Sequence, residues 1–410
     1  MINQSLLLYI DPGTGSMLFS ILIGATATLF FLGKAAFLKL KMLFSAKKDG
    51  TVIDSNYHEY VIYNEGKQYW NVFKPVCEEF EKRQIEVAYF TSDENDLCFK
   101  QGFKYVKPEF IGAGNKAFVT LNMISAKVVL MTTPGLQVYQ MKRSKNVKHY
   151  AHITHAPNDA TMYRLFGLDY FDSVLVNGDY QEAGIREIES QRDIKKKDIV
   201  TVGCPYLDVY KKDMAAIPAE ENHPFTVLVS PTWGASGILS RYGEKLLTPL
   251  AETGWRIIVR PHPQSSTSEA DMLASLKEKY KDCANVEWDF QRENIYSLKK
   301  ADVMISDFSG IIYDYTFLCD KPVIYVKAGI DLRPYDYYDL KKTKLWLLES
   351  AAEFGTELKE EQFADIKSFI SSLSDSEELA KARKKAKAEA WMYEGEAGKR
   401  VVDYLTSIEK

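Results

Sequence analysis

The chain has 410 residues, with 52 Lys or Arg against 56 Asp or Glu, so its formal net charge is −4. This near balance argues against a protein that binds nucleic acid through a bulk positive field. Hydrophobic residues make up 46% and charged residues 26%, which is ordinary for a globular protein and argues against a disordered chain or a protein with many membrane spans. The length predicts two or three domains. Five scattered cysteines without a CxxC pair support neither a disulfide framework nor a zinc ribbon.

The N-terminus departs from this average. Residues 17–33 carry no charge, and no Lys or Arg precedes them. The positive-inside rule then places the rest of the chain in the cytoplasm. The sequence predicts one transmembrane helix within a membrane anchor, residues 1–48, and a protein of the cell membrane whose body is cytoplasmic. The basic edge of the anchor consists of Lys34, Lys39, Lys41, Lys47 and Lys48.

Three other interpretations of this segment compete with a single span. A secretory signal is disfavoured because the region before the apolar run contains Asp11 and no basic residue. A buried helix of the body stays open. A re-entrant or interfacial segment also stays open, because residues 6–10 are apolar and Pro12 would break a helix.

The body alternates short apolar runs with amphipathic runs. Such alternation predicts parallel sheets covered on both faces, hence an α/β fold with two Rossmann-like domains that face a cleft. We expect the first domain over residues 49–215, a linker over 211–224, the second domain over 224–385, and a C-terminal helix over 386–410 that could pack back on the first domain. Expected strands are 60–63, 85–90, 127–131, 172–177, 199–203, 225–229, 255–259, 303–306 and 322–326, and expected helices are 68–83, 180–190, 238–252, 269–280, 311–318 and 376–409.

Polar motifs follow several of these strands, where ligands of such sheets bind. In the segment from Ile305 to Gly310, a buried strand ends in a small-residue turn that opens a helix. Free backbone N–H groups and the helix dipole make an anion site there, and Ser309 adds a hydroxyl donor. The alternative is that Asp307 or Ser309 is a plain N-cap.

Two further motifs lie in the second domain. Arg260 and His262 follow the strand 255–259, where a guanidinium and an imidazole suit phosphate. The alternative is a proline-stiffened connection with an exposed Arg. After the strand 225–229, Ser230 and Thr232 could approach a ligand closely, a weak signal on its own.

In the first domain, His152 and His155 lie at the end of an expected strand. His is the usual general base near neutral pH. We expect His155 to face the cleft and His152 to be a supporting or core residue. The sequence has no P-loop, HExxH, GxSxG or strict DxD motif, so it demands no metal and no cofactor.

Together these motifs resemble the CDP-glycerol glycerophosphotransferase family of teichoic-acid and capsule biosynthesis. The resemblance covers roughly residues 145–330, with the motifs in the family's order. It rests on Thr154-His155-Ala156-Pro157, Asn177-Gly178-Asp179-Tyr180, Gly203-Cys204-Pro205-Tyr206-Leu207-Asp208, Pro231-Thr232-Trp233, Arg260-Pro261-His262-Pro263 and Asp307-Phe308-Ser309-Gly310 with Asp314. The departures from the family pattern are Thr154 for Trp, Ala156 for Gly, Tyr206 for Arg, Gly234 for a basic residue and Gly310 for the second Ser.

The resemblance implies a GT-B fold whose first domain takes the acceptor and whose second domain takes the donor. It implies transfer of glycerol phosphate, or a related alditol phosphate, from a CDP-activated donor to a hydroxyl of a membrane-linked precursor. It makes His155 the base, with His262 as a second catalytic residue. The donor site would comprise Arg260, Asp307, Ser309, Gly310, Ser230, Thr232 and Asp314, and the acceptor side His152 and Asn158.

The expected partners are CDP-glycerol or a related CDP-alditol, a lipid-linked saccharide or phosphopolymer, and the membrane, with no nucleic acid; a homo-oligomer stays open. Two alternative functions also remain at this point. One is a GT-B glycosyltransferase that uses a nucleotide sugar, and the other is a non-catalytic, membrane-tethered binding subunit.

Overall fold

The computed structural model describes residues 26, 33, 57–218, 220, 222–327, 329–373 and 376–409. Of the expected membrane anchor, residues 1–48, only Thr26 and Gly33 belong to this set, so the predicted transmembrane helix lies outside the described residues. Within the part of the chain that the structure describes, none of the helices combines the length and the apolar character that a bilayer crossing requires.

The first sheet has seven strands in the order β3-β2-β1-β4-β5-β6-β7. Its registered pairs are parallel, for example β4 with β5 and β5 with β6. The strands are rich in apolar residues because both faces are covered, and every residue of β4 is buried. The strands are β1 (Tyr57–Asn64), β2 (Val87–Thr91), β3 (Val106–Phe110), β4 (Ser125–Met131), β5 (Val147–Ile153), β6 (Ser173–Val176) and β7 (Asp198–Thr201). The helices of this half are α2 (Trp70–Arg83), α3 (Asn115–Leu121), α4 (Glu182–Arg192) and α5 (Pro205–Ala216).

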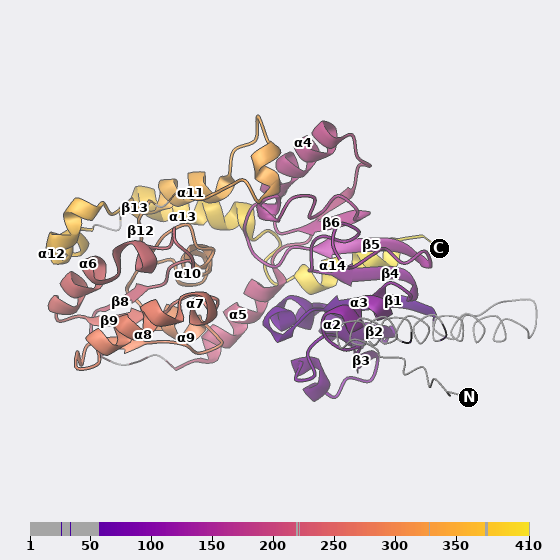
Figure 1. Ribbon diagram of the computed structural model, residues 1–410, viewed down its shortest axis with the longest axis horizontal. Coiled ribbons are helices and arrows are strands. Elements are labelled where there is room, and N and C mark those ends of the chain that lie inside the picture. Colours follow the sequence, from indigo (N-terminus) through magenta and orange to yellow (C-terminus); the bar gives the residue numbers. More distant parts are fainter. Residues whose placement is uncertain are drawn as a thin grey trace, which may run out of the picture. The chain divides into compact units, whose positions relative to one another are not determined.

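The second sheet has six strands in the order β10-β9-β8-β11-β12-β13, again with parallel pairs. The strands are β8 (Thr226–Val229), β9 (Arg256–Val259), β10 (Val286–Trp288), β11 (Val303–Ser306), β12 (Val323–Tyr325) and β13 (Thr356–Glu357). The helices are α6 (Ile238–Glu252), α7 (Ser265–Ser268), α8 (Ala270–Lys279), α9 (Ile295–Lys300), α10 (Ile311–Cys319), α11 (Trp346–Phe354), α12 (Ile366–Ser372) and α13 (Glu377–Ala390) (Figure 1).

Both sheets therefore reverse their strand order once, between β1 and β4 and between β8 and β11. Ligands of open parallel sheets bind outside the carboxyl ends of the strands at such a switch point. The loops that matter for function are those after β1, β4 and β5 in the first domain and after β8, β9 and β11 in the second.

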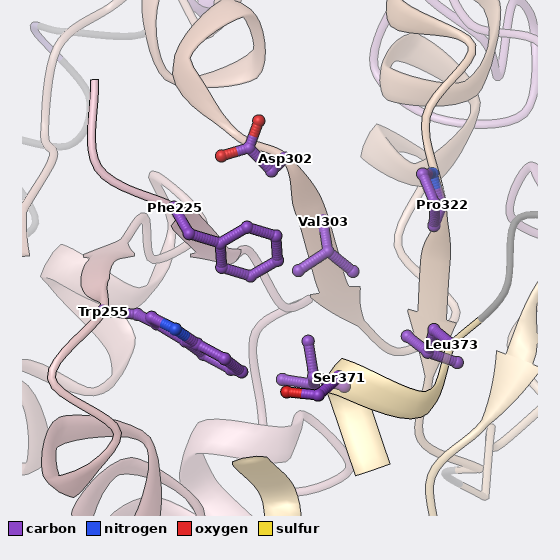
Figure 2. Close-up of a pocket in the computed structure, with 8 residues that line it drawn as sticks. Phe225, Trp255, Asp302, Val303, Pro322, Ser371 and Leu373 are labelled. Atoms are coloured by element: carbon purple, nitrogen blue, oxygen red, sulfur yellow. The ribbon is translucent and has the colours of Figure 1, made fainter. Parts of the chain in front are cut away.

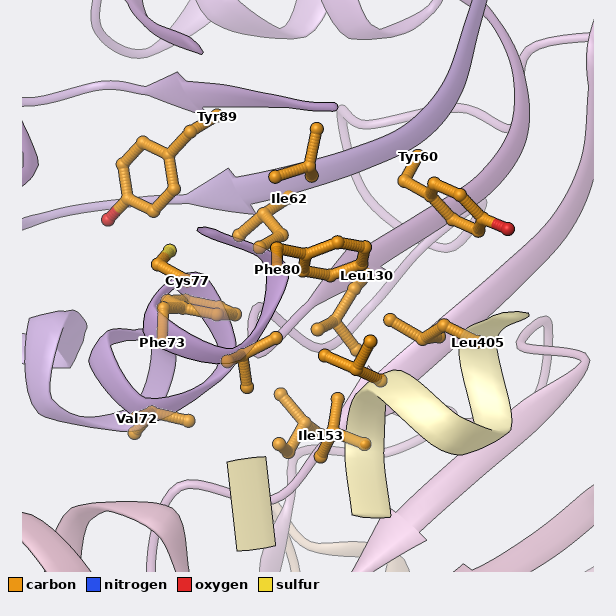
Figure 3. Close-up of a cluster of buried hydrophobic side chains, with 14 of the residues drawn as sticks. Tyr60, Ile62, Val72, Phe73, Cys77, Phe80, Tyr89, Leu130, Ile153 and Leu405 are labelled. Atoms are coloured by element: carbon orange, nitrogen blue, oxygen red, sulfur yellow. The ribbon is translucent and has the colours of Figure 1, made fainter. Parts of the chain in front are cut away.

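The chain returns to the first domain at its end. Helix α14 (Ala397–Ser407) packs against α2, as labelled in Figure 1. Figure 3 shows Leu405 of α14 beside Phe80 of α2 and Leu130 of β4 within one buried apolar cluster. Burying each such side chain stabilises the fold by roughly 1.5–3 kcal/mol. The C-terminal helix is thus part of the first domain's core.

Two glycines allow this return. A Cβ at Gly178 would lie 1.8 Å from the carbonyl oxygen of Glu389, and one at Gly203 would lie 2.3 Å from that of Met392. Gly203 also has a φ of +91°, a conformation that side chains disfavour. The backbone after β6 and after β7 is therefore in direct contact with the end of α13 and the segment that follows it.

Most expected elements appear with boundaries shifted by a few residues. The expected linker over 211–224 is shorter than predicted, because α5 continues to Ala216; Pro205 occupies its first turn, where proline is tolerated. The charged tail is two helices, α13 and α14, separated by a segment that contains Gly395 at a φ of +84°. Strands β3, β10 and β13 carried too few apolar residues to be predicted.

Candidate active site

Two cavities meet at the end of β5. The first, which we call the interdomain cavity, measures about 220 Å³ and joins the carboxyl edges of both sheets. The second, the first-domain cavity, also measures about 220 Å³. His155, Ala156 and Tyr69 line both cavities, so the imidazole stands between them. The interdomain cavity is lined by Gln68, Tyr69, Asn71, Val72, His155, Ala156, Tyr206, Tyr210, Gly310 and Asp314. The first-domain cavity is lined by Tyr69, Pro134, Thr154, His155, Ala156, Asn158, Asp159, Ala160, Met162 and Tyr163.

His155 is held by one ring nitrogen. Its Nδ1 lies 3.1 Å from the hydroxyl oxygen of Thr132 and 3.3 Å from that of Tyr163. Burial lowers the pKa of His155 to about 4, so the ring is neutral near pH 7. A neutral imidazole in contact with two cavities can accept a proton from a hydroxyl group, which is the chemistry of a general base.

The turn that carries His155 is braced by Asn177, at the end of β6. The hydroxyl of Thr154 donates to Asn177 Oδ1 at 2.8 Å, and Asn177 Nδ2 donates to the carbonyl of Ala156 at 2.8 Å. Thr154 and Ala156 are two of the departures from the family pattern. Thr154 is only 2% exposed and uses its hydroxyl for this bond, which explains how a small polar residue is accommodated there.

At the switch point of the second sheet, Asp307 ties two loops together. Its carboxylate accepts from the backbone N–H of Thr232 at 2.9 Å, of Ser309 at 3.1 Å and of Ile238 at 3.1 Å. Asp307 is 3% exposed, and burial raises its pKa to about 6 against these donors. Ser230 is equally internal, since its hydroxyl donates to the carbonyl of Arg260 at 3.2 Å. These contacts shape the site's backbone and leave Asp307 and Ser230 little surface for a ligand.

The turn held by Asp307 opens α10. The backbone N–H groups of Gly310 and Ile311 have no acceptor among the described residues. Gly310 lines the interdomain cavity, and the positive end of the α10 dipole lies at this helix start. Ser309 is half-buried beside this start but is not among the residues that line the cavity. The expected anion site is therefore carried by backbone, with Gly310 at its centre.

Arg260 is engaged elsewhere. Its guanidinium donates to Asp289 at 2.6 Å and to the carbonyls of Gln291 at 2.8 Å and Arg292 at 3.2 Å. Arg260 is 7% exposed and does not line the interdomain cavity. The sequence suggested a phosphate ligand; in the structure this Arg organises the loop after β10, because its fork of donors matches a carboxylate and two carbonyls.

His262 lies at the same edge of the second sheet, with its ring 6.4 Å from that of the exposed Trp233. Its Nδ1 accepts from the backbone N–H of Gln264 at 3.1 Å, so the proton of the neutral ring is on Nε2. Burial lowers the pKa of His262, while Glu269 opposes this. His262 thus presents a neutral N–H donor. It is not among the lining residues of either cavity.

Asp314 lies at the cavity, one turn into α10. The hydroxyl of Tyr206 donates to one carboxylate oxygen, and Asn294 Nδ2 donates to the other at 3.0 Å. Burial raises the pKa of Asp314 to about 6, opposed by Tyr206, Asn294 and the charge of Arg260. Tyr206 stands where the family has an Arg. Its hydroxyl therefore donates a hydrogen bond to a carboxylate of the second domain.

The two acceptor-side candidates, Asn158 and His152, lie in different surroundings: one lines a cavity and the other is in the core. Asn158 lines the first-domain cavity and lies against Gly310, since a Cβ on Gly310 would be 3.1 Å from Asn158 Oδ1. That oxygen has no hydrogen-bond partner among the described residues. His152 is fully buried and packs edge-on against the rings of Tyr163 and Phe171, each at 5.0 Å. It lines neither cavity and belongs to the core, the second of the two roles that the sequence suggested.

Carboxylates also fix the two domains to each other. Asp159 accepts from the backbone N–H of Trp346 at 3.1 Å and of Leu347 at 2.9 Å, which caps the start of α11. Asp336 accepts in the opposite direction, from Phe166 N–H at 2.7 Å. These hydrogen bonds join the first and the second domain at two places.

A larger cavity lies at the other edge of the second sheet. It measures about 430 Å³ and is bounded by Phe225, Trp255 and Leu373, among others (Figure 2). Phe225 and Trp255 precede β8 and β9, so this cavity is at the amino ends of the strands. Because ligands of such sheets bind at the carboxyl ends, the larger cavity is not the candidate active site.

Sequence reasoning missed several uncharged residues of the site. Tyr69 and Gln68 follow β1, Tyr210 lies on α5, and Thr132 follows β4. The position of Thr132 directly after an expected strand was a usable signal, because that strand adjoins the one that carries His155. Tyr69 and Tyr210 gave no signal, since aromatic residues at helical spacing resemble core residues. No group of His, Cys, Asp and Glu within the described residues could hold a metal ion.

Comparison with known proteins adds independent findings. The model of the CDP-Glycerol:Poly(glycerophosphate) glycerophosphotransferase family matches residues 115–407. Comparison with curated protein sequences gives no match.

Several solved structures share the fold. The wall teichoic acid polymerase TagF is 14% identical, with a TM-score of 0.56, covering 87% of this chain and 90% of that chain. The UDP-GlcNAc 2-epimerase from Neisseria meningitidis is 13% identical, with a TM-score of 0.52 over 85% of this chain and 100% of that one. A glycosyltransferase from Rickettsia africae ESF-5 is 10% identical, with a TM-score of 0.51 over 86% and 99%. At these identities the likeness establishes the two-domain, GT-B-like fold.

Proposed function

The chain belongs to the CDP-glycerol:poly(glycerophosphate) glycerophosphotransferase family, and from this premise we propose how its site moves glycerol phosphate. The enzyme transfers glycerol phosphate from CDP-glycerol in teichoic-acid synthesis. The family match favours this activity over a nucleotide-sugar glycosyltransferase and over a non-catalytic subunit. The observation that carries the proposed mechanism is the position of His155 between the two cavities.

The donor occupies the interdomain cavity. A TagF variant soaked with CDPG shares the fold, at 13% identity and a TM-score of 0.53 over 93% of this chain and 96% of that chain. The cavity's 220 Å³ is below the roughly 300–1,000 Å³ of pockets that enclose a whole ligand. We therefore assign it the phosphoglycerol end of the donor, with the free N–H groups of Gly310 and Ile311 toward the phosphates and Asp314 toward a donor hydroxyl.

The acceptor enters from the first-domain cavity, past Asn158. His155 takes the proton of an acceptor hydroxyl, and the oxygen attacks the β-phosphorus of the donor. The bond between that phosphorus and the bridging oxygen breaks, and CMP leaves with the electron pair. The helix start at Gly310 and the Nε2–H of His262 stabilise the charge that develops. Such transfer depends on positioning and electrostatics, with little covalent chemistry for the protein.

The remaining donor-site candidates act through the loops. Asp307, Ser230 and Thr232 hold the backbone after β8 and β11, Arg260 holds the loop that supplies Asn294 to Asp314, and Ser309 adds a hydroxyl beside the helix start. The mechanism demands no metal and no cofactor.

The acceptor is a lipid-linked saccharide or phosphopolymer, and residues 1–48 keep the enzyme at the membrane where that acceptor lies. The apolar run 17–33 and its basic edge support a single span with the body in the cytoplasm. Carbonate extraction of membranes that contain the full chain tests this. A span keeps the protein in the pellet, and release into the supernatant contradicts it.

Transfer itself is tested with labelled CDP-glycerol, membranes and lipid acceptor. CDP-ribitol and UDP-sugars serve as competing donors, and thermal stabilisation of the enzyme reports their binding. We expect stabilisation and transfer with CDP-glycerol. Stabilisation by a UDP-sugar without any by CDP-glycerol would overturn the donor assignment.

A further inference from the structure

The hydroxyl next to His155 has only one proton to give. Thr132 follows β4, is 1% exposed, and donates its hydroxyl proton to the carbonyl of Ile153 at 2.8 Å. The same oxygen lies 3.1 Å from His155 Nδ1. Because a hydroxyl has a single hydrogen, this oxygen can only accept from the imidazole. Nδ1 must then carry the proton of the neutral ring.

Tyr163 does not reverse this assignment. Its hydroxyl oxygen lies 3.3 Å from the same Nδ1 and could donate to a bare nitrogen. In that arrangement the lone pairs of Nδ1 and of the Thr132 oxygen would face each other at 3.1 Å with no proton between them. Two acceptors at that distance repel, so the arrangement in which Tyr163 is the donor is disfavoured. The Nδ1–H form satisfies both oxygens at once.

We propose that Thr132 is a positioning residue that fixes His155 in the Nδ1–H tautomer and thereby leaves the lone pair on Nε2. This inference rests on the proposed function of His155 as the base. Nε2 has no hydrogen-bond partner among the described residues, and the ring lines both cavities. The acceptor proton moves to Nε2, while Nδ1–H stays bonded to Thr132. The oxygen of Thr132 also accepts from the imidazolium that forms in the reaction.

The tautomer determines whether His155 can act at all. With the proton on Nε2, the ring would offer a donor to the acceptor hydroxyl and could not remove its proton. Removing the Thr132 hydroxyl leaves Tyr163 as the remaining partner of Nδ1, and its O–H then donates to that nitrogen. The expected consequence of Thr132→Val is a shift of the ring proton to Nε2.

The experiment labels the histidines of the full-length enzyme with 15N and reads the protonation of both His155 nitrogens by long-range 1H–15N NMR near pH 7.5. The His155→Asn spectrum identifies the resonances. We expect Nδ1 protonated and Nε2 bare in the wild type, Thr132→Ser and Tyr163→Phe, and the reverse in Thr132→Val. A bare Nδ1 in the wild type, or an unchanged tautomer in Thr132→Val, would overturn the proposal.

Kinetics on the same variants add a second readout. Thr132→Val should lower kcat by about 10–100-fold with the KM for CDP-glycerol unchanged, and Thr132→Ser should recover most of the loss because it restores the acceptor oxygen. A variant that merely loosens the fold would also change KM and would not be rescued by Ser. If the wild type transfers nothing from CDP-glycerol, the proposed function fails, yet the NMR result still decides the role of Thr132.

Discussion

The two switch points of this molecule have the same strand order but differ in what they place at the ligand. In the first domain, side chains form the site: Thr132 and Tyr163 contact Nδ1 of His155, and Nε2 has no hydrogen-bond partner among the described residues. In the second domain, Asp307 accepts hydrogen bonds from the backbone, and Gly310, whose N–H has no acceptor among the described residues, lines the interdomain cavity. With the proposed function, this difference places proton transfer on the first sheet and anion binding on the second.

The largest effect is expected in the first domain, where side chains surround the proposed base His155. Replacing His155 by Asn keeps a polar group but removes the base, so transfer should fall by about 10²–10⁴-fold with the affinity for CDP-glycerol unchanged. Labelled-glycerol transfer to lipid acceptor measures this. His149→Asn is the matched control, because His149 lies on β5, the strand that His155 follows, is bonded to Ser173 at 2.8 Å, and lines neither cavity. Equal transfer by His155→Asn and the wild type would refute the role of His155.

A second effect separates a structural Arg from a phosphate ligand. Arg260→Met leaves Asp289 without its partner in a pair whose side chains are 8% and 11% exposed. Breaking such a pair should lower the free energy of unfolding by about 3–5 kcal/mol. Denaturant titration measures the loss, and Asp289→Asn in the same chain should restore part of it. An Arg260→Met protein of unchanged stability that binds CDP-glycerol poorly would instead identify Arg260 as a ligand of the donor.

Asp314 connects the two edges and should make stability depend on pH. Its pKa is about 6 in the folded chain, raised by burial above the unfolded value of about 3.9. The folded state thus binds the proton more tightly, so this contribution to stability is fully present below pH 4 and is lost as pH rises through 6. Relative to the wild type, Asp314→Asn should gain up to about 3 kcal/mol between pH 4 and 7.5. Denaturant titration at each pH measures both proteins. A difference in their free energies of unfolding that stays constant from pH 4 to 7.5 would contradict the raised pKa.

The sequence predicted the site of the first domain better than the site of the second domain. The strand–helix alternation predicted the α/β fold and its two Rossmann-like domains, and the family resemblance is confirmed by the family model. His155 stood out because it lies at the end of an expected strand, where it was expected to face the cleft. The opposite edge misled the sequence argument, because Arg260 and Asp307 have side chains suited to ligands but use them on the protein's own backbone and on Asp289.

The contacts that join the two domains at the site could not be found in the sequence, for a physical reason. Tyr206 reaches Asp314 from a helix more than 100 positions earlier, a pairing that depends on how the two domains meet. Asn158 meets Gly310 in the same way. Contacts of this kind leave no local pattern, since neither residue is unusual within its own segment.

The smallest effect is expected in the second domain, at the start of α10, where backbone N–H groups make the proposed anion site. Val at position 310 places branched carbons where a Cβ already lies 3.1 Å from Asn158 Oδ1, and it crowds the free N–H groups. The affinity for CDP-glycerol should fall about 10-fold, or about 1.4 kcal/mol. Gly329→Val is the matched control, because Gly329 is exposed and a Cβ there meets nothing within 4 Å. Unchanged affinity in Gly310→Val would remove the helix start from the donor site.

One measurement tests the division between the edges most directly: the Kd of CDP-glycerol for His155→Asn and Gly310→Val, determined side by side by calorimetry with the wild type. The division predicts that His155→Asn binds the donor as the wild type does and that Gly310→Val binds it about 10-fold more weakly. If His155→Asn weakens binding as much as Gly310→Val, the two edges do not divide proton transfer and anion binding between them.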